Sequence, residues 1–173
     1  PTQSSDRDMD IWRFSYYTMG TDLKDIALMQ FSDIKDGLWF YNREKTGEGG
    51  LGKPLLKEAM EIVLKHYDAK NKYVFNWILE DGKYDINQRV IKDRINMIIN
   101  NLSRRYRKVS NDIGLDGHFA WRSARYSSAS NVVNKGGNVK DVQVLMDHSS
   151  VTTTERYARY ANHEKMREAL ELL

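Results

Sequence analysis

Apolar residues recur every three or four positions through most of the chain, which is the spacing of the buried face of an amphipathic helix. The pattern predicts two helices near the start, over residues 8–19 and 22–29, and Gly20 ends the first. A third helix is predicted over residues 54–67. The inward faces of these helices carry apolar or small side chains at helical spacing: Ile11, Phe14, Tyr17 or Thr18, Leu23, Ile26, Ala27, Leu55, Ala59, Ile62, Val63 and Tyr67.

The second half of the chain contains the longest helical pattern. It predicts a helix over residues 86–109, whose apolar face is formed by side chains at the same spacing: Val90, Ile91, Ile95, Ile98, Ile99 and Leu102. A loop is predicted over residues 111–117. Further helices are expected over residues 120–134, 139–146, 151–161 and 163–173.

Between the second and third helices the pattern changes to short aromatic runs typical of strands. Residues 31–34 and 38–45 flank Lys35-Asp36-Gly37, a turn signal, and a short third strand is predicted before Pro54. Another apolar run, residues 73–79, is interpreted as a strand or a buried loop. The expected fold is mixed α+β and mostly helical, with a small three-stranded antiparallel sheet packed beside a helical bundle.

The length and composition are those of one soluble globular domain. The 173 residues are enough to bury a core, so residues 1–173 are interpreted as a single domain. The chain has no cysteine, which excludes disulfides and thiolate metal sites and fits a cytoplasmic protein. No run is long and apolar enough for a membrane span, and the first residues do not have the pattern of a signal peptide.

The positive charge of the chain is concentrated in one third of it. The formal net charge is only +3, but residues 89–140 carry eleven Lys or Arg against three Asp, a local balance of +8. This asymmetry favours a surface that faces phosphates. Within it, Arg104, Arg105, Arg107 and Lys108 close the longest predicted helix and are candidate DNA-binding residues. The alternative is an ordinary solvated basic helix.

The residue types suited to phosphate chemistry lie close together near the C-terminus. Arg122 and Arg125 are three apart, which puts them on one face of a helix. His148 follows on the next helical segment, and Tyr157 stands nine residues beyond it. Guanidinium groups match phosphate oxygens, and a tyrosine phenol can act as a covalent nucleophile. The set therefore indicates a phosphoryl-transfer site.

The stretch from Arg122 to Tyr157 resembles the C-terminal signature of the tyrosine recombinases, the phage integrase family. The usual form is H-x-x-R, a turn with glycine, L-G-H-S-S, a threonine run and the nucleophilic tyrosine. Arg125 matches the second arginine, His148 the histidine before the nucleophile, and Tyr157 the nucleophile itself. Arg122 stands where the first histidine is usual, and Gly136-Gly137 matches the turn. The predicted order of elements also resembles the catalytic domain of this family, so the resemblance covers nearly the whole chain.

The same resemblance implies a role for Lys45. The family has a lysine at the turn between its second and third strands, which is implicated as the general acid on the departing 5′ oxygen. Lys45 precedes Thr46-Gly47 at the matching place. The alternative is an ordinary hairpin lysine.

The chain departs from the family at the first arginine, which usually stands in T-G-x-R-x-x-E-L. One alignment puts Asp22 in its place and another, seen in integrases of Bacteroidetes mobile elements, puts Met19 there. We expect Asp22 to point away from a phosphate or to pair with a nearby cation. Arg43 is the candidate replacement, because it alternates with Lys45 along the predicted strand and some integrases of that branch carry a similar R-x-K-T-G. The alternative for Arg43 is an exposed strand charge.

The resemblance implies the catalytic domain of a site-specific DNA recombinase or integrase, excised from a longer protein with an N-terminal DNA-binding domain. It implies a 3′-phosphotyrosyl intermediate, no cofactor, double-stranded DNA as partner, and a bacterial cytoplasmic protein that joins the nucleoid when bound. It also implies a tetrameric synapse on DNA, with the isolated domain a monomer. The helix over residues 163–173 would pack on a neighbouring protomer or on its own domain.

Three other functions remain open at this stage. The missing first arginine, Asp22 and Asp147 are compatible with a degenerate recombinase fold that binds DNA without cutting it. A topoisomerase-like relaxing enzyme would share the chemistry. A helical interaction protein could use its basic face on an acidic protein partner.

Overall fold

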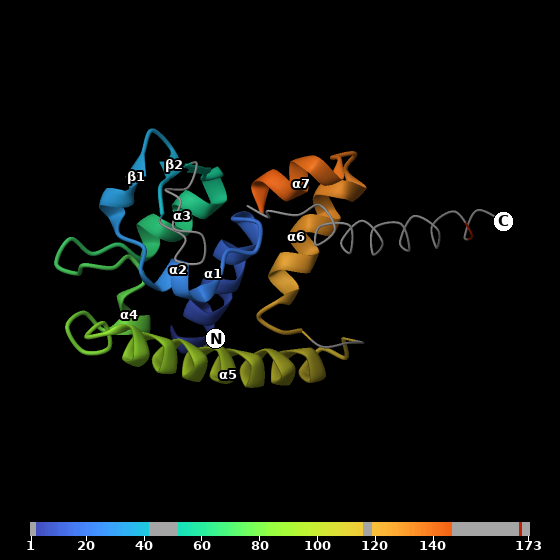
Figure 1. Cartoon of the computed structure of the whole chain (residues 1–173). Helices are drawn as coiled ribbons and strands as arrows, with labels where there is room; N and C mark the ends of the chain where they lie inside the picture. The colour runs from blue at the N-terminus through green and yellow to red at the C-terminus, as the bar shows by residue number, and fades with distance from the viewer. Residues whose placement is uncertain (1–2, 42–51, 116–118, 147–169, 171–173) are drawn as a thin grey trace.

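The fold was analysed in a computed structural model that describes residues 3–41, 52–115, 119–146 and 170 (Figure 1). The elements follow one another along the chain as α1 (Gln3–Tyr17), α2 (Leu23–Ala27), the 3₁₀ turn η1 (Phe31–Asp33), β1 (Ile34–Lys35), β2 (Leu38–Trp39), β3 (Lys53–Pro54), α3 (Lys57–His66), α4 (Asn76–Leu79), α5 (Gln88–Asp112), α6 (Ser123–Asn134) and α7 (Val139–Leu145). The expected fold class, mostly helical with a small three-stranded antiparallel sheet, is confirmed. No helix in these described ranges is long and apolar enough to cross a membrane.

The sheet is small and has the order β1-β2-β3, with both pairs antiparallel. Asp36 and Gly37 join β1 to β2 with positive φ angles of 51° and 75°, as a tight two-residue hairpin requires. This confirms the turn predicted at residues 35–37. Residues 31–33 were expected in a strand but form η1, because the Asp33 carboxylate accepts a hydrogen bond from the Gln30 backbone N–H at 2.9 Å and closes a turn.

The main core is built around α1. Ile11 and Phe14 are fully buried, and the Phe14 ring meets those of Trp39 and Phe75 at centroid distances of 5.8 and 5.2 Å. Helix α1 packs against α3 and α6, while α2 and α4 pack against α5 (Figure 1). In this way α1 joins the sheet region to α6, which carries Arg125 and is preceded directly by Arg122.

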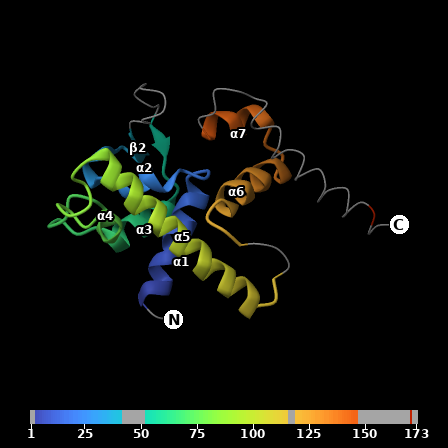
Figure 2. The same ribbon diagram turned by 60° about the horizontal axis from the view of Figure 1, so that its bottom comes forward.

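Helix α5 crosses one face of the molecule, with α1 behind it (Figure 2). Asn87 caps its first turn by accepting a hydrogen bond from the Val90 backbone N–H at 3.0 Å. Its buried positions recur at helical spacing: Ile91, Ile95, Ile98, Leu102, Tyr106 and Ser110. The predicted helix is confirmed, shifted toward the C-terminus at both ends.

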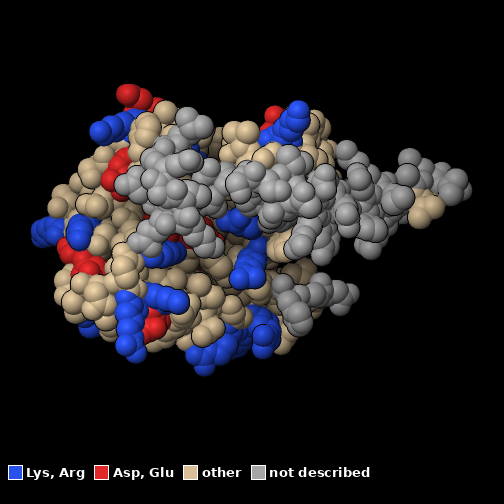
Figure 3. Space-filling model, in the orientation of Figure 1, with Lys and Arg blue, Asp and Glu red and all other residues tan. Residues whose placement is uncertain are grey.

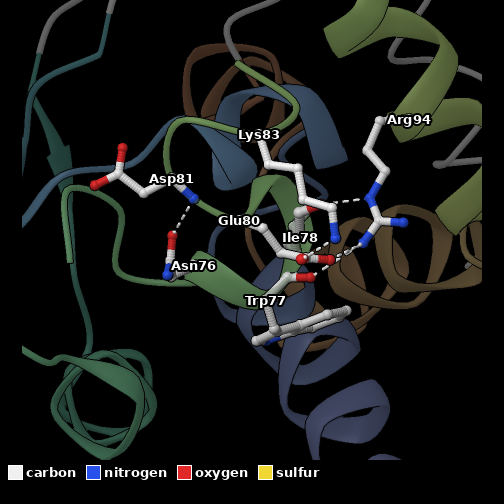
Figure 4. A network of polar contacts seen from close by, with 7 residues as sticks. All are labelled: Asn76, Trp77, Ile78, Glu80, Asp81, Lys83 and Arg94. Atoms are coloured by element: carbon white, nitrogen blue, oxygen red, sulfur yellow. Dashed lines mark hydrogen bonds and ion pairs between the residues drawn. The ribbon is translucent and has the colours of Figure 1, made fainter. Parts of the chain in front are cut away.

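Arg94 of α5 ties this long helix to α4 (Figure 4). Its Nε donates to the Ile78 carbonyl at 2.8 Å, and a terminal nitrogen lies 3.1 Å from the Glu80 carboxylate. The side chain is only 12% exposed. Arg94 therefore provides a hydrogen-bond donor for the Ile78 carbonyl, since the carbonyls at the end of so short a helix have no partner within it.

Two of the sequence expectations for this region are corrected. Of the run expected as a strand or a buried loop, residues 73–75 are a buried non-helical segment and residues 76–79 form the one-turn helix α4. The apolar character of the run reports the burial of Phe75, Ile78 and Leu79 and not the backbone period. Tyr67, expected on the inward face of a helix, lies just past the end of α3 and is 40% exposed, where it stacks on Phe31 at 4.2 Å. The predicted helices over residues 151–161 and 163–173 lie outside the described residues.

Candidate active site

Arg125 is held in the first turn of α6 by the turn that follows α1. Its Nε donates a hydrogen bond to the Gly20 carbonyl at 2.9 Å, and its side chain is 20% exposed. Gly20 has a φ of 74°, and a Cβ built on it would lie 2.3 Å from the Arg125 Cβ and 2.6 Å from its Cα. Only glycine lets the two backbones approach this closely. The turn after α1 therefore fixes where this guanidinium stands.

Arg122 lies immediately before α6 and is exposed. Its carbonyl accepts the backbone N–H of Arg125 at 3.1 Å, so the two arginines share one helical turn, as their spacing predicts. Helix α6 is tied to α1 by polar contacts: Trp12 Nε1 donates to Ser123 Oγ at 3.1 Å and Asn131 Nδ2 donates to the Tyr16 hydroxyl at 2.8 Å. The arginines thus stand on a helix anchored to the core.

The two residues considered for the place of the first arginine have different surroundings. Met19, with a φ of 57°, packs against the small apolar cluster that joins α6 to α7. The carboxylate of Asp22 lies 3.8 Å from a terminal nitrogen of Arg125, and its side chain is 53% exposed. The expectation that Asp22 pairs with a nearby cation is confirmed, and that cation is Arg125.

A second cation, which sequence reasoning missed, binds the same turn. Lys53 of β3 donates from Nζ to the Thr18 carbonyl and to Thr21 Oγ1, each at 3.0 Å. In the sequence Lys53 is simply a lysine in a short predicted strand, and such a lysine is commonly an exposed charge. The contact joins residues 35 positions apart, which no local pattern reveals.

The candidate DNA-binding residues lie along α5, and Lys and Arg side chains gather over this helix at the lower edge of Figure 3. All four are exposed: Arg104, Arg105, Arg107 and Lys108. Arg105 also has a structural contact, a salt bridge to the buried carboxylate of Asp8 in α1. Beside it the Tyr106 hydroxyl donates to the Asp8 carbonyl at 2.6 Å, and burial raises the pKa of Tyr106 well above its usual range.

The glycine turn of the signature ends α6 as predicted. Gly136 has a φ of 93°, and the Gly137 N–H donates to the Val132 carbonyl at 2.9 Å. Helix α7 then folds back on α6, burying Val142 and Met146 against Ala129. The remaining predicted site residues, Arg43, Lys45, His148 and Tyr157, lie outside the described residues.

Comparison with known proteins gives a consistent family. The profile described as "Phage integrase family" matches residues 7–164. A tyrosine recombinase of Thermosipho africanus (strain TCF52B) is 26% identical over 151 residues, which cover 86% of this chain and 48% of that protein. The chain thus spans about half the length of this curated relative.

Solved structures of similar fold carry the same family names. A XerA recombinase superposes with a TM-score of 0.61 at 16% identity, covering 98% of this chain and 65% of the other. A Tn1549 transposon integrase in complex with transposon right end DNA gives 0.64 at 16% identity, covering 99% and 60%. A lambda integrase dimer bound to a COC' core site gives 0.60 at 19% identity, covering 90% and 53%. The fold is shared, and with the profile match over most of its length this chain belongs to the phage integrase family.

Proposed function

We propose that this chain is the catalytic domain of a tyrosine-type site-specific DNA recombinase or integrase. The observation that carries the proposal is the placement of Arg122 and Arg125 on one anchored helical turn, within a chain that belongs to the phage integrase family. Two guanidiniums at one turn provide several donors for the oxygens of one phosphate.

In the proposed reaction the Tyr157 phenol loses its proton to solvent, and its oxygen attacks a backbone phosphorus and forms a 3′-phosphotyrosyl bond. The bond from phosphorus to the 5′ oxygen breaks, and Lys45 gives that oxygen a proton, so a 5′ hydroxyl is released. A 5′ hydroxyl of another strand reverses the step. The phosphotyrosyl ester conserves the bond energy, so rejoining needs no ATP. Arg122, Arg125 and His148 hold the phosphate and stabilise its developing charge, and Arg43 is a candidate for the same role.

The contact between Arg125 and Asp22 is compatible with this role. Their atoms are 3.8 Å apart, which is beyond a normal hydrogen bond, and Asp22 is half exposed to water. An exposed ion pair of this kind contributes little free energy. A DNA phosphate that makes direct hydrogen bonds to the guanidinium can therefore displace the carboxylate, while the Gly20 carbonyl continues to hold Nε in place.

The proposal extends to the larger assembly. We infer that the chain is the catalytic part of a longer bacterial protein with an N-terminal DNA-binding domain, and that four protomers form a synapse on double-stranded DNA. In this arrangement the segment over residues 163–173 would pack on a neighbouring protomer. The exposed basic residues of α5 would contact the phosphate backbone, which makes binding sensitive to salt.

The experiment that tests the proposal traps the covalent intermediate. The substrate is a duplex of the protein's own recombination site, nicked near the crossover so that the released fragment diffuses away. A denaturing gel should show a protein–DNA adduct with the wild-type chain and none with Tyr157→Phe. A longer protein that includes the preceding domain should be run in parallel.

A second candidate function is a recombinase fold that binds DNA without cutting it. Asp22 favours it, because one alignment puts this carboxylate in the first arginine's place and it lies 3.8 Å from a terminal nitrogen of Arg125. In that case both this chain and the longer protein bind the duplex in a salt-dependent manner, yet neither forms an adduct. Absence of salt-sensitive DNA binding would instead favour a helical interaction protein with an acidic protein partner.

A further inference from the structure

Lys53 points toward the interior of the protein from a very short strand. In the antiparallel pair of β2 and β3 it stands directly opposite Trp39, which is fully buried, and opposite residues project from the same face of a sheet. Its neighbour Pro54, on the other face, is exposed. A lysine is seldom directed inward unless its ammonium finds hydrogen-bond acceptors.

Two acceptors of its ammonium belong to the turn after α1. Nζ lies 3.0 Å from the Thr18 carbonyl and 3.0 Å from Thr21 Oγ1, and it stands 5.5 Å from the centre of the Tyr41 ring. The turn thus holds the ammonium by one backbone and one side-chain oxygen. Both acceptors are buried residues, which fixes the end of the long side chain.

The same turn holds Arg125 through the Gly20 carbonyl. A cation from β3 and a cation from α6 therefore bind neighbouring residues of one turn, although they are far apart in sequence. The turn itself supplies no cation, since Met19 packs into an apolar cluster and Asp22 is negative. Arg125 and Asp22 carry opposite charges. Lys53 adds a second positive charge to the residues that bind this turn.

We propose that Lys53 supplies, to the phosphate bound by Arg125, the positive charge that the missing first arginine supplies elsewhere in the family. This inference rests on the proposed recombinase function and deepens it. The ammonium comes from the sheet and not from the turn, but it binds Thr18 and Thr21, which stand on either side in sequence of the Gly20 whose carbonyl binds Arg125. A positive charge held at this turn would favour the dianionic character that develops on the phosphate during cleavage.

A purely structural role for Lys53 would have different consequences. The Thr18 carbonyl belongs to the last turn at the end of α1, where a cation also stabilises the helix. If that were the whole role, loss of the charge would weaken folding but would not depend on the charge of the DNA. The experiment must therefore vary the charge of the phosphate as well as the residue.

The test uses Lys53→Met, which keeps an unbranched apolar stem, and Lys53→Arg, which keeps the charge. Lys35→Met is the matched control, because Lys35 is an exposed lysine of β1 in the same sheet. Each variant is given the duplex that forms the Tyr157 adduct, with either an ordinary phosphate or an uncharged methylphosphonate at the scissile position. The rate of adduct formation is measured, and thermal melts report folding.

We expect Lys53→Met to form adduct about 100-fold more slowly on the ordinary phosphate, the typical loss of one charge-stabilising donor. On the methylphosphonate, its rate should come within a few-fold of wild type, since this substrate carries one negative charge fewer than the phosphate in both the ground state and the transition state. Lys53→Arg should keep most of the rate on the ordinary phosphate. Lys35→Met should match wild type on both substrates.

Three results would overturn the inference, and they are distinguishable. If Lys53→Met matches wild type on the ordinary phosphate, Lys53 has no part in the reaction while the proposed function stands. If the rate of Lys53→Met falls by the same factor on both substrates, the only role of Lys53 is to hold the turn after α1. If wild type itself forms no adduct, the proposed function fails and this inference fails with it.

Discussion

The contact between Gly20 and Arg125 makes a prediction about stability that can be worked out from the structure. Gly20→Ala adds one methyl group at a place where φ is 74°. That methyl would lie 2.3 and 2.6 Å from carbons of Arg125, well inside the van der Waals separation of about 3.5 Å. The atoms that the methyl would meet are the Cα, Cβ and Cγ of Arg125 in α6. They cannot move away unless the helix moves with them.

Two effects of Gly20→Ala lower the free energy of unfolding. An alanine in the left-handed region costs about 1 kcal/mol relative to glycine. Forcing an extra methyl into a packed contact costs a further ~1–3 kcal/mol. The free energy of unfolding should therefore fall by roughly 2–4 kcal/mol, which for a chain of this size lowers Tm by about 10 °C.

Gly37→Ala is the matched control, because Gly37 has a φ of 75° but no atom within 4 Å of its built Cβ. It should show only the backbone cost of about 1 kcal/mol. Urea unfolding followed by circular dichroism measures both variants, with the slope m checked for a change in the unfolded state. If Gly20→Ala loses no more stability than Gly37→Ala, then the close approach between the turn and α6 is not what we infer.

Three further predictions concern other contacts. Arg94→Ala should lower the free energy of unfolding by about 1–3 kcal/mol in urea, because carbonyls at the end of α4 lose their donor. Burial works to raise the pKa of Asp10, but hydrogen bonds from Lys65 and His66 outweigh it and hold this pKa below its ordinary value of 3.8. The stabilisation is therefore complete above that value and is lost as the pH falls through the lower folded-state pKa, and acid unfolding of Asp10→Asn should lack this component. Arg107→Ala should weaken DNA binding about equally on all sequences and reduce the slope of log K against log salt by ~1 in fluorescence titrations.

Local patterns were sufficient for most of the secondary structure. The period of apolar residues placed α5, α6 and α7 to within a few residues, since an amphipathic face is written directly in the order of residues. The Asp36-Gly37 turn was equally local, because its positive φ angles restrict the residue types. The apolar run that contains α4 did not distinguish a helix from a strand. A short apolar segment indicates burial, but it is too short to reveal helical or strand spacing.

What the sequence by itself determined was most of the helices, the hairpin turn, and the signature that contains Arg122 and Arg125, whose shared helical turn follows from their spacing alone. Only the tertiary structure decided the surroundings of that signature. The contact of Arg125 with Gly20 spans 105 residues and that of Lys53 with Thr18 spans 35. Such contacts depend on how α6 and β3 pack on the end of α1, which is set by core volume and chain geometry and not by any local pattern.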